Sequence, residues 1–248
     1  MKISAIIITH NEERNIGRCI DSLAEVADEI VVVDSMSNDR TQEICKEKGA
    51  RFIQREWTNY SDQKNFANEQ ASGDYILSID ADEAISDDLK ASILTIKSNP
   101  SSKVYSMNRL TNYCGKWIKH CGWYPDTKTR IWEKGYARWQ GTIHETLKLE
   151  SNQVEHLSGD LFHYSYYSVS QHIGQINRFT DLQAQELIAK GKKPNLLKLV
   201  LSPPFKFFQK YIIQGGFKDG KEGYVISKMA AYYVFCKHAK HRVLHDKQ

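Results

Sequence analysis

The first eighty residues alternate between apolar runs and helix-like patterns. Ile3–Thr9 (ISAIIIT) and Glu29–Asp34 (EIVVVD) are rich in isoleucine or valine along most of their length. Such continuous runs are typical of strands that are buried on both faces, as in a parallel sheet. Between them, the apolar residues of 16–23 recur at helical spacing. This spacing predicts a helix, with Asn11 as its N-cap and Glu12 in its first turn.

The same alternation continues up to the eightieth residue. The pattern predicts a helix over 40–48 that Gly49 ends, a short strand over Arg51–Gln54, a helix over 61–71 and a strand over 74–79. Strands that alternate with helices in this way favour a mostly parallel sheet with helices on both faces.

The pattern changes after the eighty-third residue. Asp87–Ser98 reads as one more helix, and 103–166 is rich in Tyr, Trp and β-branched residues with interspersed Gly. That composition predicts antiparallel strands that extend the same sheet. From Ser168 the apolar spacing is helical again. We therefore predict an α/β domain over 1–167 and a helical segment over 168–248.

Composition places the chain among ordinary globular proteins. Of its 248 residues, 41% are hydrophobic and 26% are charged, which excludes a disordered or low-complexity chain. The five cysteines are odd in number and widely spaced, and no signal peptide precedes them. We expect reduced thiols and a cytoplasmic protein. Cys114 and Cys121 flank His120 without a Cys-x-x-Cys pair, so they are expected to be ordinary thiols rather than zinc ligands.

The charge is unevenly distributed along the chain. The net charge is +4, but 190–248 holds 13 Lys and Arg against 3 Asp and Glu, whereas 1–189 holds 21 against 27. A basic end on an acidic body indicates an anionic partner. No recognised nucleic-acid-binding module accompanies this charge, so a membrane surface is favoured. No apolar run reaches the roughly 18 residues that a membrane-spanning helix needs.

The segment 196–217 (LLKLVLSPPFKFFQKYIIQGGF) mixes apolar and aromatic residues with lysines. Such a mixture suits a surface that lies in the lipid interface. It equally suits a helical pair packed on the rest of the chain or on a partner. Pro203 and Pro204 are expected to divide the segment into two short helices.

Polar residues stand at the ends of three predicted strands. Thr9 to Glu12 follow the first strand, Asp34 ends the second, and Asp80 to Glu83 follow the fourth. In an open α/β sheet, ligands bind outside the carboxyl ends of the strands, so these residues are expected to converge on one site. The sequence has no Gly-x-Gly-x-x-Gly after the first strand and no P-loop, which argues against a dinucleotide site and against a P-loop nucleotide site.

Asp80 and Asp82 carry the clearest chemical signal. Two carboxylates at i and i+2 that end an apolar strand suit a hard divalent cation with open positions for phosphate oxygens. Such a cation would neutralise the charge that develops on a departing diphosphate. The alternative is a solvated acidic turn that caps the next helix.

The motifs IIITHNEERNI, VVVDSMSNDRT and ILSIDADE, in this order, resemble those of the family-2 glycosyltransferases with the GT-A fold. The resemblance covers residues 1 to about 165. The combination of THNEE, DADE and a later His-Glu is similar to the bacterial lipopolysaccharide-core β-glucosyltransferases. Where the wider family has a Tyr-Asn-Glu type of motif, this chain has Thr9, His10 and Asn11.

The resemblance implies a donor site at the predicted edge of the sheet. The donor-binding residues would be Thr9, Asn11, Glu12, Asp34, Lys64, Asp80 and Glu83. Asp34 would accept the N3–H of a uracil base, and Lys64 would contact the donor phosphate or sugar. The alternatives are loop closure for Asp34, an exposed helix position for Lys64, and helix capping for Glu12 and Glu83.

The resemblance also implies Mg²⁺ or Mn²⁺ at the acidic motif. Asp82 would be the principal ligand, Asp80 would lie nearer the ribose or sugar, and His163 would be a third ligand, since imidazole can join carboxylates around manganese. The alternative for His163 is a structural histidine.

Inverting transfer needs a base opposite the leaving group. In Gly-Thr-Ile-His-Glu at 141–145, Glu145 is the candidate base, and His144 would orient the acceptor or a phosphate. Arg130 would place charge near the diphosphate or acceptor. Tryptophan rings suit sugar faces, and one of three is expected to stack on ligand: Trp117, Trp123 and Trp139.

These features together predict an inverting hexosyltransferase. Its donor would be a nucleotide-diphosphate sugar, with UDP as the expected nucleotide, and its acceptor a glycan or glycolipid of the bacterial cell envelope. It would lie in the cytoplasm, with peripheral contact to the inner face of the membrane. A nucleotidyltransferase and a noncatalytic sugar- or lipid-binding module are the alternatives.

Overall fold

The computed structural model describes residues 1–141, 145–150 and 153–246. The chain forms two compact units. The first unit comprises Met1–Arg109 and Asp126–Tyr164, and the second comprises Leu110–Pro125 and Ser165–Gln248.

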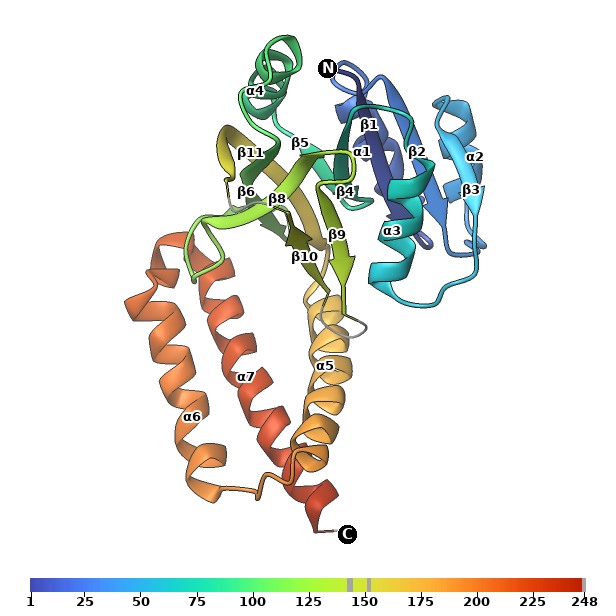
Figure 1. The fold of residues 1–248 in the computed structure, drawn as a ribbon. Coiled ribbons are helices and arrows are strands. Elements are labelled where there is room, and N and C mark those ends of the chain that lie inside the picture. The colour runs from blue at the N-terminus through green and yellow to red at the C-terminus, as the bar shows by residue number, and fades with distance from the viewer. Residues whose placement is uncertain (142–144, 151–152, 247–248) are drawn as a thin grey trace. The chain divides into compact units, whose positions relative to one another are not determined.

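A sheet that runs in the order β3-β2-β1-β4-β8-β6-β11-β5 forms the centre of the fold (Figure 1). The strands β1, β2, β3 and β4 pair in parallel. Their bounds are Ile3–Thr9, Glu29–Asp34, Arg51–Gln54 and Tyr75–Asp80. These bounds agree with the strands predicted from the apolar runs.

The antiparallel extension predicted for 103–166 is also present. β8 pairs antiparallel with both β4 and β6, and β11 pairs antiparallel with β5. These strands are β5 (Glu83–Ile85), β6 (Val104–Tyr113), β8 (Asp126–Glu133) and β11 (Glu155–Tyr166). A separate antiparallel pair is formed by β9 (Ala137–Gln140) and β10 (Thr146–Leu149).

Helices of the first unit lie on both faces of its sheet. They are α1 (Ile16–Leu23), α2 (Thr41–Glu47), α3 (Tyr60–Gln70) and α4 (Asp87–Ser98). Apolar residues of α1, α2 and α4 share one core with Ile3, Ala5 and Ile7 of β1. Ile6, which points to the other face, packs in a second core with residues of α3 and β9. The predicted α/β fold with helices on both faces of the sheet is therefore confirmed.

The start of α1 differs from the prediction. The helix begins at Ile16, its N-cap is Asn15, and Asn11 has a left-handed φ of 54°. The Asn11 side chain instead accepts a hydrogen bond from the backbone N–H of Asn38 at 2.9 Å. Asn11 thus joins two loops at the sheet edge and does not cap the helix.

The second unit contains the helical part of the chain. Its helices are α5 (Val169–Ala189), α6 (Leu196–Phe208) and α7 (Gly220–His245), and β7 (Lys116–Ile118) pairs with the end of β6. α7 packs against both α5 and α6. Between α6 and α7 lie a π-helical turn, Gln209–Ile213, and a 3₁₀ turn, Gly216–Asp219.

The two prolines do not divide α6, so that expectation was wrong. Pro203 and Pro204 lie inside one continuous helix. A proline removes one backbone donor, but its fixed φ of about −65° is itself helical, so a helix can continue through it at a cost in hydrogen bonding.

His172 on α5 is expected to make the second unit sensitive to acid. Its side chain is buried, its Nδ1 lies 3.1 Å from the Tyr113 hydroxyl, and burial lowers its pKa to about 4. Below the ordinary histidine pKa of about 6.5 the unfolded state binds the proton more readily, so stability falls with pH until about 4. Between about pH 7.5 and pH 5 we expect a loss of about 2 kcal/mol in the free energy of unfolding.

Urea denaturation at both pH values checks this prediction, with His172→Gln as the comparison. The variant should lose most of the pH dependence, because glutamine does not titrate. An equal pH dependence in both proteins would assign the effect to other groups.

Candidate functional site

The register of the parallel strands brings the predicted polar residues to one edge. Thr9 of β1 is paired with Asp34 of β2, and Ile8 of β1 is paired with Asp80 of β4. Because the three strands end together, the residues that follow them lie at neighbouring places on the edge, as expected.

The loop after β1 is hydrogen-bonded to the loop after β2. The backbone N–H of Asn11 donates to Ser37 Oγ at 2.8 Å, and the N–H of Glu12 donates to Thr41 Oγ1 at 2.8 Å. The hydroxyl of Thr9 is buried and has no hydrogen-bond partner among the described residues. A buried hydroxyl without a partner is costly, which marks this place as one where a ligand could bond.

Asp34 is fully buried and closes the turn after β2. Its carboxylate accepts from the backbone N–H of Ser37 at 2.8 Å and from the Ser37 hydroxyl, with Gln54 Nε2 3.5 Å away. The structure thus shows directly the loop-closing contacts considered from the sequence.

Glu12 is half-buried and accepts a hydrogen bond from Asn15 Nδ2 at 2.7 Å. Burial raises its pKa, and the charge of Asp82 adds to this effect, while the bond from Asn15 acts against it. Glu12 and Asp82 therefore repel each other electrostatically, which is the situation that a bound cation would relieve.

Asp80 is held between two buried cations. Its Oδ2 lies 2.7 Å from Arg130 Nη2, and its Oδ1 lies 3.2 Å from Lys64 Nζ. Burial alone would raise the pKa of Asp80, but the Arg130 guanidinium and the Lys64 ammonium outweigh it and hold the pKa well below its usual range. Asp80 is thus a fixed anion at the end of β4.

Glu83 completes a buried charge network with Arg130. Arg130 Nη2 lies 2.7 and 2.8 Å from the two carboxylate oxygens of Glu83, and the backbone N–H of Asp80 donates to Glu83 Oε2 at 2.9 Å. The carboxylates raise the pKa of Arg130 although burial acts in the opposite direction. Glu83 does not cap the next helix, because Ser86 is the N-cap of α4.

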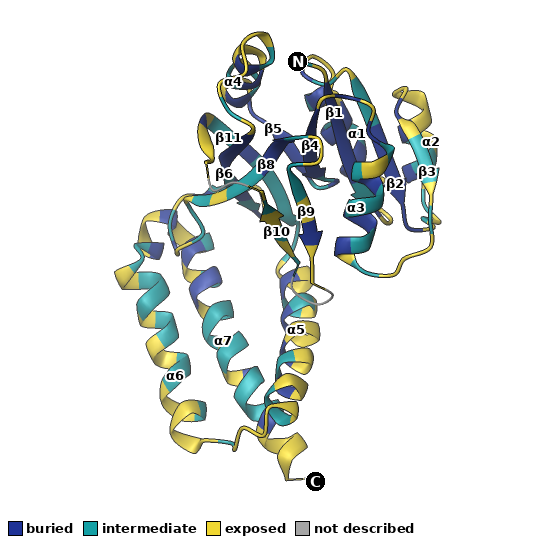
Figure 2. Ribbon diagram, in the orientation of Figure 1, coloured by how far each residue is buried: buried dark blue, intermediate teal, exposed yellow. Residues whose placement is uncertain are grey.

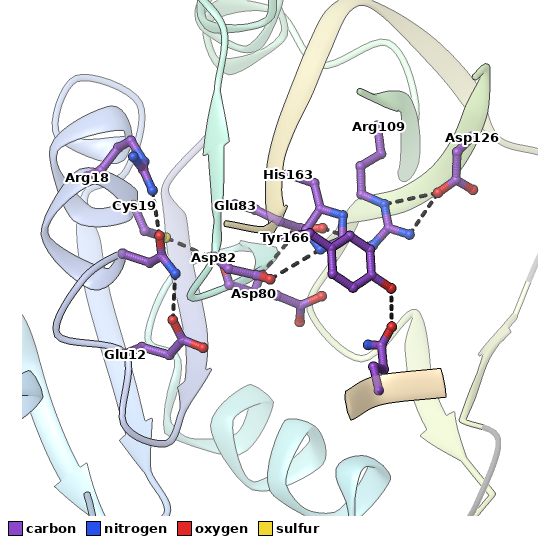
Figure 3. Close-up of polar contacts among 12 residues, drawn as sticks. Glu12, Arg18, Cys19, Asp80, Asp82, Glu83, Arg109, Asp126, His163 and Tyr166 are labelled. Carbon is purple, nitrogen blue, oxygen red and sulfur yellow. Dashed lines mark hydrogen bonds and ion pairs between the residues drawn. The ribbon is translucent and has the colours of Figure 1, made fainter. Parts of the chain in front are cut away.

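Arg109 and Asp126 extend this network and were not identified from the sequence. Arg109 donates to Asp126 Oδ2 through Nε at 3.0 Å and Nη2 at 2.8 Å, and its Nη1 lies 3.4 Å from Glu83 Oε1 (Figure 3). β6 and β8 bring the two residues together as antiparallel partners. Two polar residues on separate strands give no local sequence signal, so only the strand pairing reveals them.

Lys64 joins Asp80 to the candidate base. Its ammonium lies 3.8 Å from Glu145 Oε1 and 4.4 Å from the centre of the Trp139 ring. The residue is only 5% exposed, so the alternative of a solvated helix lysine is excluded. A lysine that is buried between two carboxylates and an aromatic face is held in one place, since its charge is compensated only there.

These side chains line a cavity of about 400 Å³ in the first unit. Charged and polar residues of β6, β8 and α3 form most of its wall. The lining residues are Lys64, Asp80, Arg109, Thr127, Lys128, Thr129, Arg130, Trp139, Glu145 and Leu147. A concave site with convergent charges and one aromatic wall suits a polar, sugar-sized ligand.

Asp82 and His163 form a second pair near this network. Asp82 Oδ2 lies 3.2 Å from His163 Nε2 (Figure 3). The backbone N–H of Tyr164 donates to the Asp82 carbonyl at 2.9 Å. β11 and β5 bring His163 opposite Glu83. The three predicted metal ligands therefore do not share one cluster. Asp82 contacts His163, whereas Asp80 is paired with Arg130 and Lys64.

The other predicted residues fall into three groups. Trp139 lies in the cavity wall, whereas Trp117 and Trp123 belong to the second unit. His144 lies outside the described residues. In the part of the chain that the structure describes, no group of three or more His, Cys, Asp and Glu side chains is gathered as for a metal ion.

Comparison with known proteins decides the family. Residues 4–147 match the model of glycosyl transferase family 2. The chain belongs to this family. The matched residues include the strand-end motifs and Glu145. The protein is therefore a glycosyltransferase, and not the nucleotidyltransferase or the noncatalytic binding module considered from the sequence.

Relatives match this glycosyltransferase over nearly its whole length. An uncharacterized glycosyltransferase of Rickettsia bellii is 34% identical, covering 98% of this chain and 87% of that protein. The lipopolysaccharide core biosynthesis glycosyltransferase LpsC of Rhizobium meliloti is 30% identical, covering 97% and 92%. A crystal structure of glucosyl-3-phosphoglycerate synthase from Mycobacterium tuberculosis, with Mn²⁺ and UDP, shares 22% identity over 45% of this chain and 44% of that one, with a TM-score of 0.38.

Proposed function

We propose that this glycosyltransferase moves a hexose, with inversion, from a UDP-linked donor to a glycan or glycolipid of the bacterial cell envelope. The observation that carries the proposal is the cavity at the sheet edge, where Lys64 links Asp80 to Glu145. The likeness to LpsC, which is named for lipopolysaccharide core biosynthesis, supports an acceptor of that type.

The donor would bind where β1, β2 and β4 end. The uncompensated hydroxyl of Thr9 and the half-buried carboxylate of Glu12 offer polar contacts there. Asp34 and Asn11 hold the loops between which the nucleotide would lie, and base recognition by Asp34 would require its bonds to Ser37 to open. Asp80, which is fixed by Arg130 and Lys64, would contact the ribose or the sugar.

The pair of Asp82 and His163 fits a divalent cation. Asp82 and His163 would hold the cation together, since Asp82 Oδ2 and His163 Nε2 face each other 3.2 Å apart. Mg²⁺ commonly binds one or two carboxylates and takes its other ligands from water and substrate phosphate. Bound there, Mg²⁺ or Mn²⁺ would supply positive charge to the diphosphate leaving group.

Glu145 would act as the base. Its carboxylate takes the proton of the acceptor hydroxyl while that oxygen attacks the anomeric carbon, and the bond from this carbon to the diphosphate oxygen breaks as the new bond forms. Attack from the side opposite the diphosphate inverts the anomeric configuration. Lys64 holds Glu145 and Asp80 on the same cavity wall, so the base and the sugar contact keep a fixed spacing.

Arg130 would act through Asp80 and Glu83. Its guanidinium is only 4% exposed and is bonded to both carboxylates, so its role is to hold Asp80 at the end of β4. Arg109 and Lys128 are more exposed members of the same wall, and both are paired with Asp126. Their remaining N–H groups would contact an anionic group of the acceptor.

Asp82→Asn tests the metal assignment. An amide is a weaker ligand than a carboxylate, so we expect UDP release from a UDP-hexose in the presence of Mn²⁺ to fall by about 100-fold or more. Removal of metal with EDTA should lower the wild-type activity to a similar level. Asp87→Asn, at a fully exposed carboxylate on α4, is the matched control and should keep normal activity. Full metal-dependent turnover by Asp82→Asn would contradict the assignment.

A further inference from the structure

The helix α6 presents an unpartnered apolar face. None of its residues is buried, although most of them are apolar (Figure 2). Six exposed residues recur at intervals of one, three or four positions, so they form one stripe along the helix and the turn that follows it. This apolar stripe consists of Leu197, Val200, Leu201, Phe205, Phe208 and Ile212, and Leu197 is 68% exposed.

The face of α6 that borders the apolar stripe already has a partner. Phe207 stacks on Tyr211 with ring centres 5.3 Å apart and meets Tyr224 of α7 edge-on at 5.7 Å. Lys228 of α7 lies 4.6 Å from the centre of the Phe207 ring. Packing within the second unit therefore uses the Phe207 face and leaves the apolar stripe uncovered.

The chain around the apolar stripe is uniformly basic. Residues 190–218 contain no Asp or Glu and seven lysines: Lys190, Lys192, Lys193, Lys198, Lys206, Lys210 and Lys218. Burial lowers the pKa of Lys237 on α7, and the charges of Lys198 and Lys206 add to this effect, so these lysines repel one another.

The positive charge around the apolar stripe favours an anionic membrane over a second copy of the chain as its partner. A second copy of the chain seated on it would bring two sets of lysines together with no carboxylate in 190–218 to neutralise them, and like charges in contact are unfavourable. Anionic lipid headgroups neutralise lysines, while the acyl boundary takes up apolar side chains. Among the described residues no helix is long and apolar enough to cross a bilayer.

We propose that α6 lies in the surface of an anionic membrane, with the apolar stripe in the acyl boundary and the neighbouring lysines on the headgroups. This contact goes beyond sugar transfer. It can be measured without donor or acceptor, so it stands or fails independently of the reaction proposed above.

Flotation of the full chain with vesicles tests the proposal. The protein should float with vesicles of phosphatidylglycerol and phosphatidylcholine, and much less with phosphatidylcholine alone. Leu197→Gln/Leu201→Gln/Phe205→Gln should weaken this binding by about tenfold or more, since three apolar side chains no longer enter the lipid. Because these residues are exposed, the variant should remain folded, which circular dichroism checks.

Two further variants separate the two parts of the contact. Lys192→Gln/Lys193→Gln/Lys198→Gln should also weaken binding to anionic vesicles by about tenfold or more. Phe179→Gln/Leu182→Gln removes two exposed apolar residues of α5, 44% and 51% exposed, and should bind as the wild type does.

Three results would overturn the proposal. One is a wild-type protein that does not bind anionic vesicles, and another is an α6 variant that binds them no more weakly than the α5 control. The third is a dimer in sedimentation equilibrium that the α6 substitutions dissociate, because a second copy would then cover the stripe.

Discussion

Glu145→Gln is expected to lower kcat for sugar transfer by about 10²–10⁴, the range typical of a lost general base. Glutamine has almost the same shape and can keep a contact with Lys64, whose ammonium lies 3.8 Å from the carboxylate. It cannot take a proton from the acceptor. Donor binding should therefore be retained, as measured by the rise in unfolding temperature on adding the nucleotide sugar.

The matched control for this change is Glu150→Gln. Glu150 follows the same strand pair but is exposed and does not line the cavity. Its substitution should leave kcat unchanged. Transfer by Glu145→Gln at the wild-type rate would show that the base lies elsewhere in the protein.

Arg130→Met is expected to cost about 3–5 kcal/mol in the free energy of unfolding. Arg130 is buried and bonded to Asp80 and to Glu83, whose side chain has no exposed surface. Removing the cation leaves buried carboxylates without their main partner, and the longer contact from Arg109, at 3.4 Å, compensates only in part. Urea denaturation at neutral pH measures the loss.

Two comparisons make this prediction specific. Arg40→Met removes an arginine that is 65% exposed and pairs with Glu43, and it should leave the free energy of unfolding almost unchanged, because solvent screens an exposed pair. Adding Glu83→Gln to Arg130→Met should recover part of the loss, because the unpaired charge is then gone. If Arg130→Met were as stable as Arg40→Met, the ion pairs of Arg130 with Asp80 and Glu83 would not stabilise the site.

The edge of the sheet could be predicted from the sequence because its signals are local. Continuous apolar runs fix the strands, and a parallel register carries Thr9, Asp34 and Asp80 to one edge. The contact between Asn11 and Asn38 was missed for the opposite reason. The partner lies in a different loop, and nothing near Asn11 in the sequence indicates it.

The burial of Lys64 could not be deduced from its own helix. Lys64 is held by carboxylates from β4 and from the residue before β10, and by the ring of Trp139. Arg109 and Asp126 were missed similarly, since their pairing depends on the register of β6 against β8. In each case the deciding partners are distant in sequence.

The most direct test of the proposed chemistry is thermal unfolding with a panel of nucleotide sugars, each with and without Mn²⁺. We expect a UDP-hexose to raise the unfolding temperature of the wild type more with Mn²⁺ than without it. Glu145→Gln should keep this rise and Asp82→Asn should lose its dependence on the metal. If no nucleotide sugar raised the unfolding temperature of the wild type with Mn²⁺, the proposed donor site would be wrong.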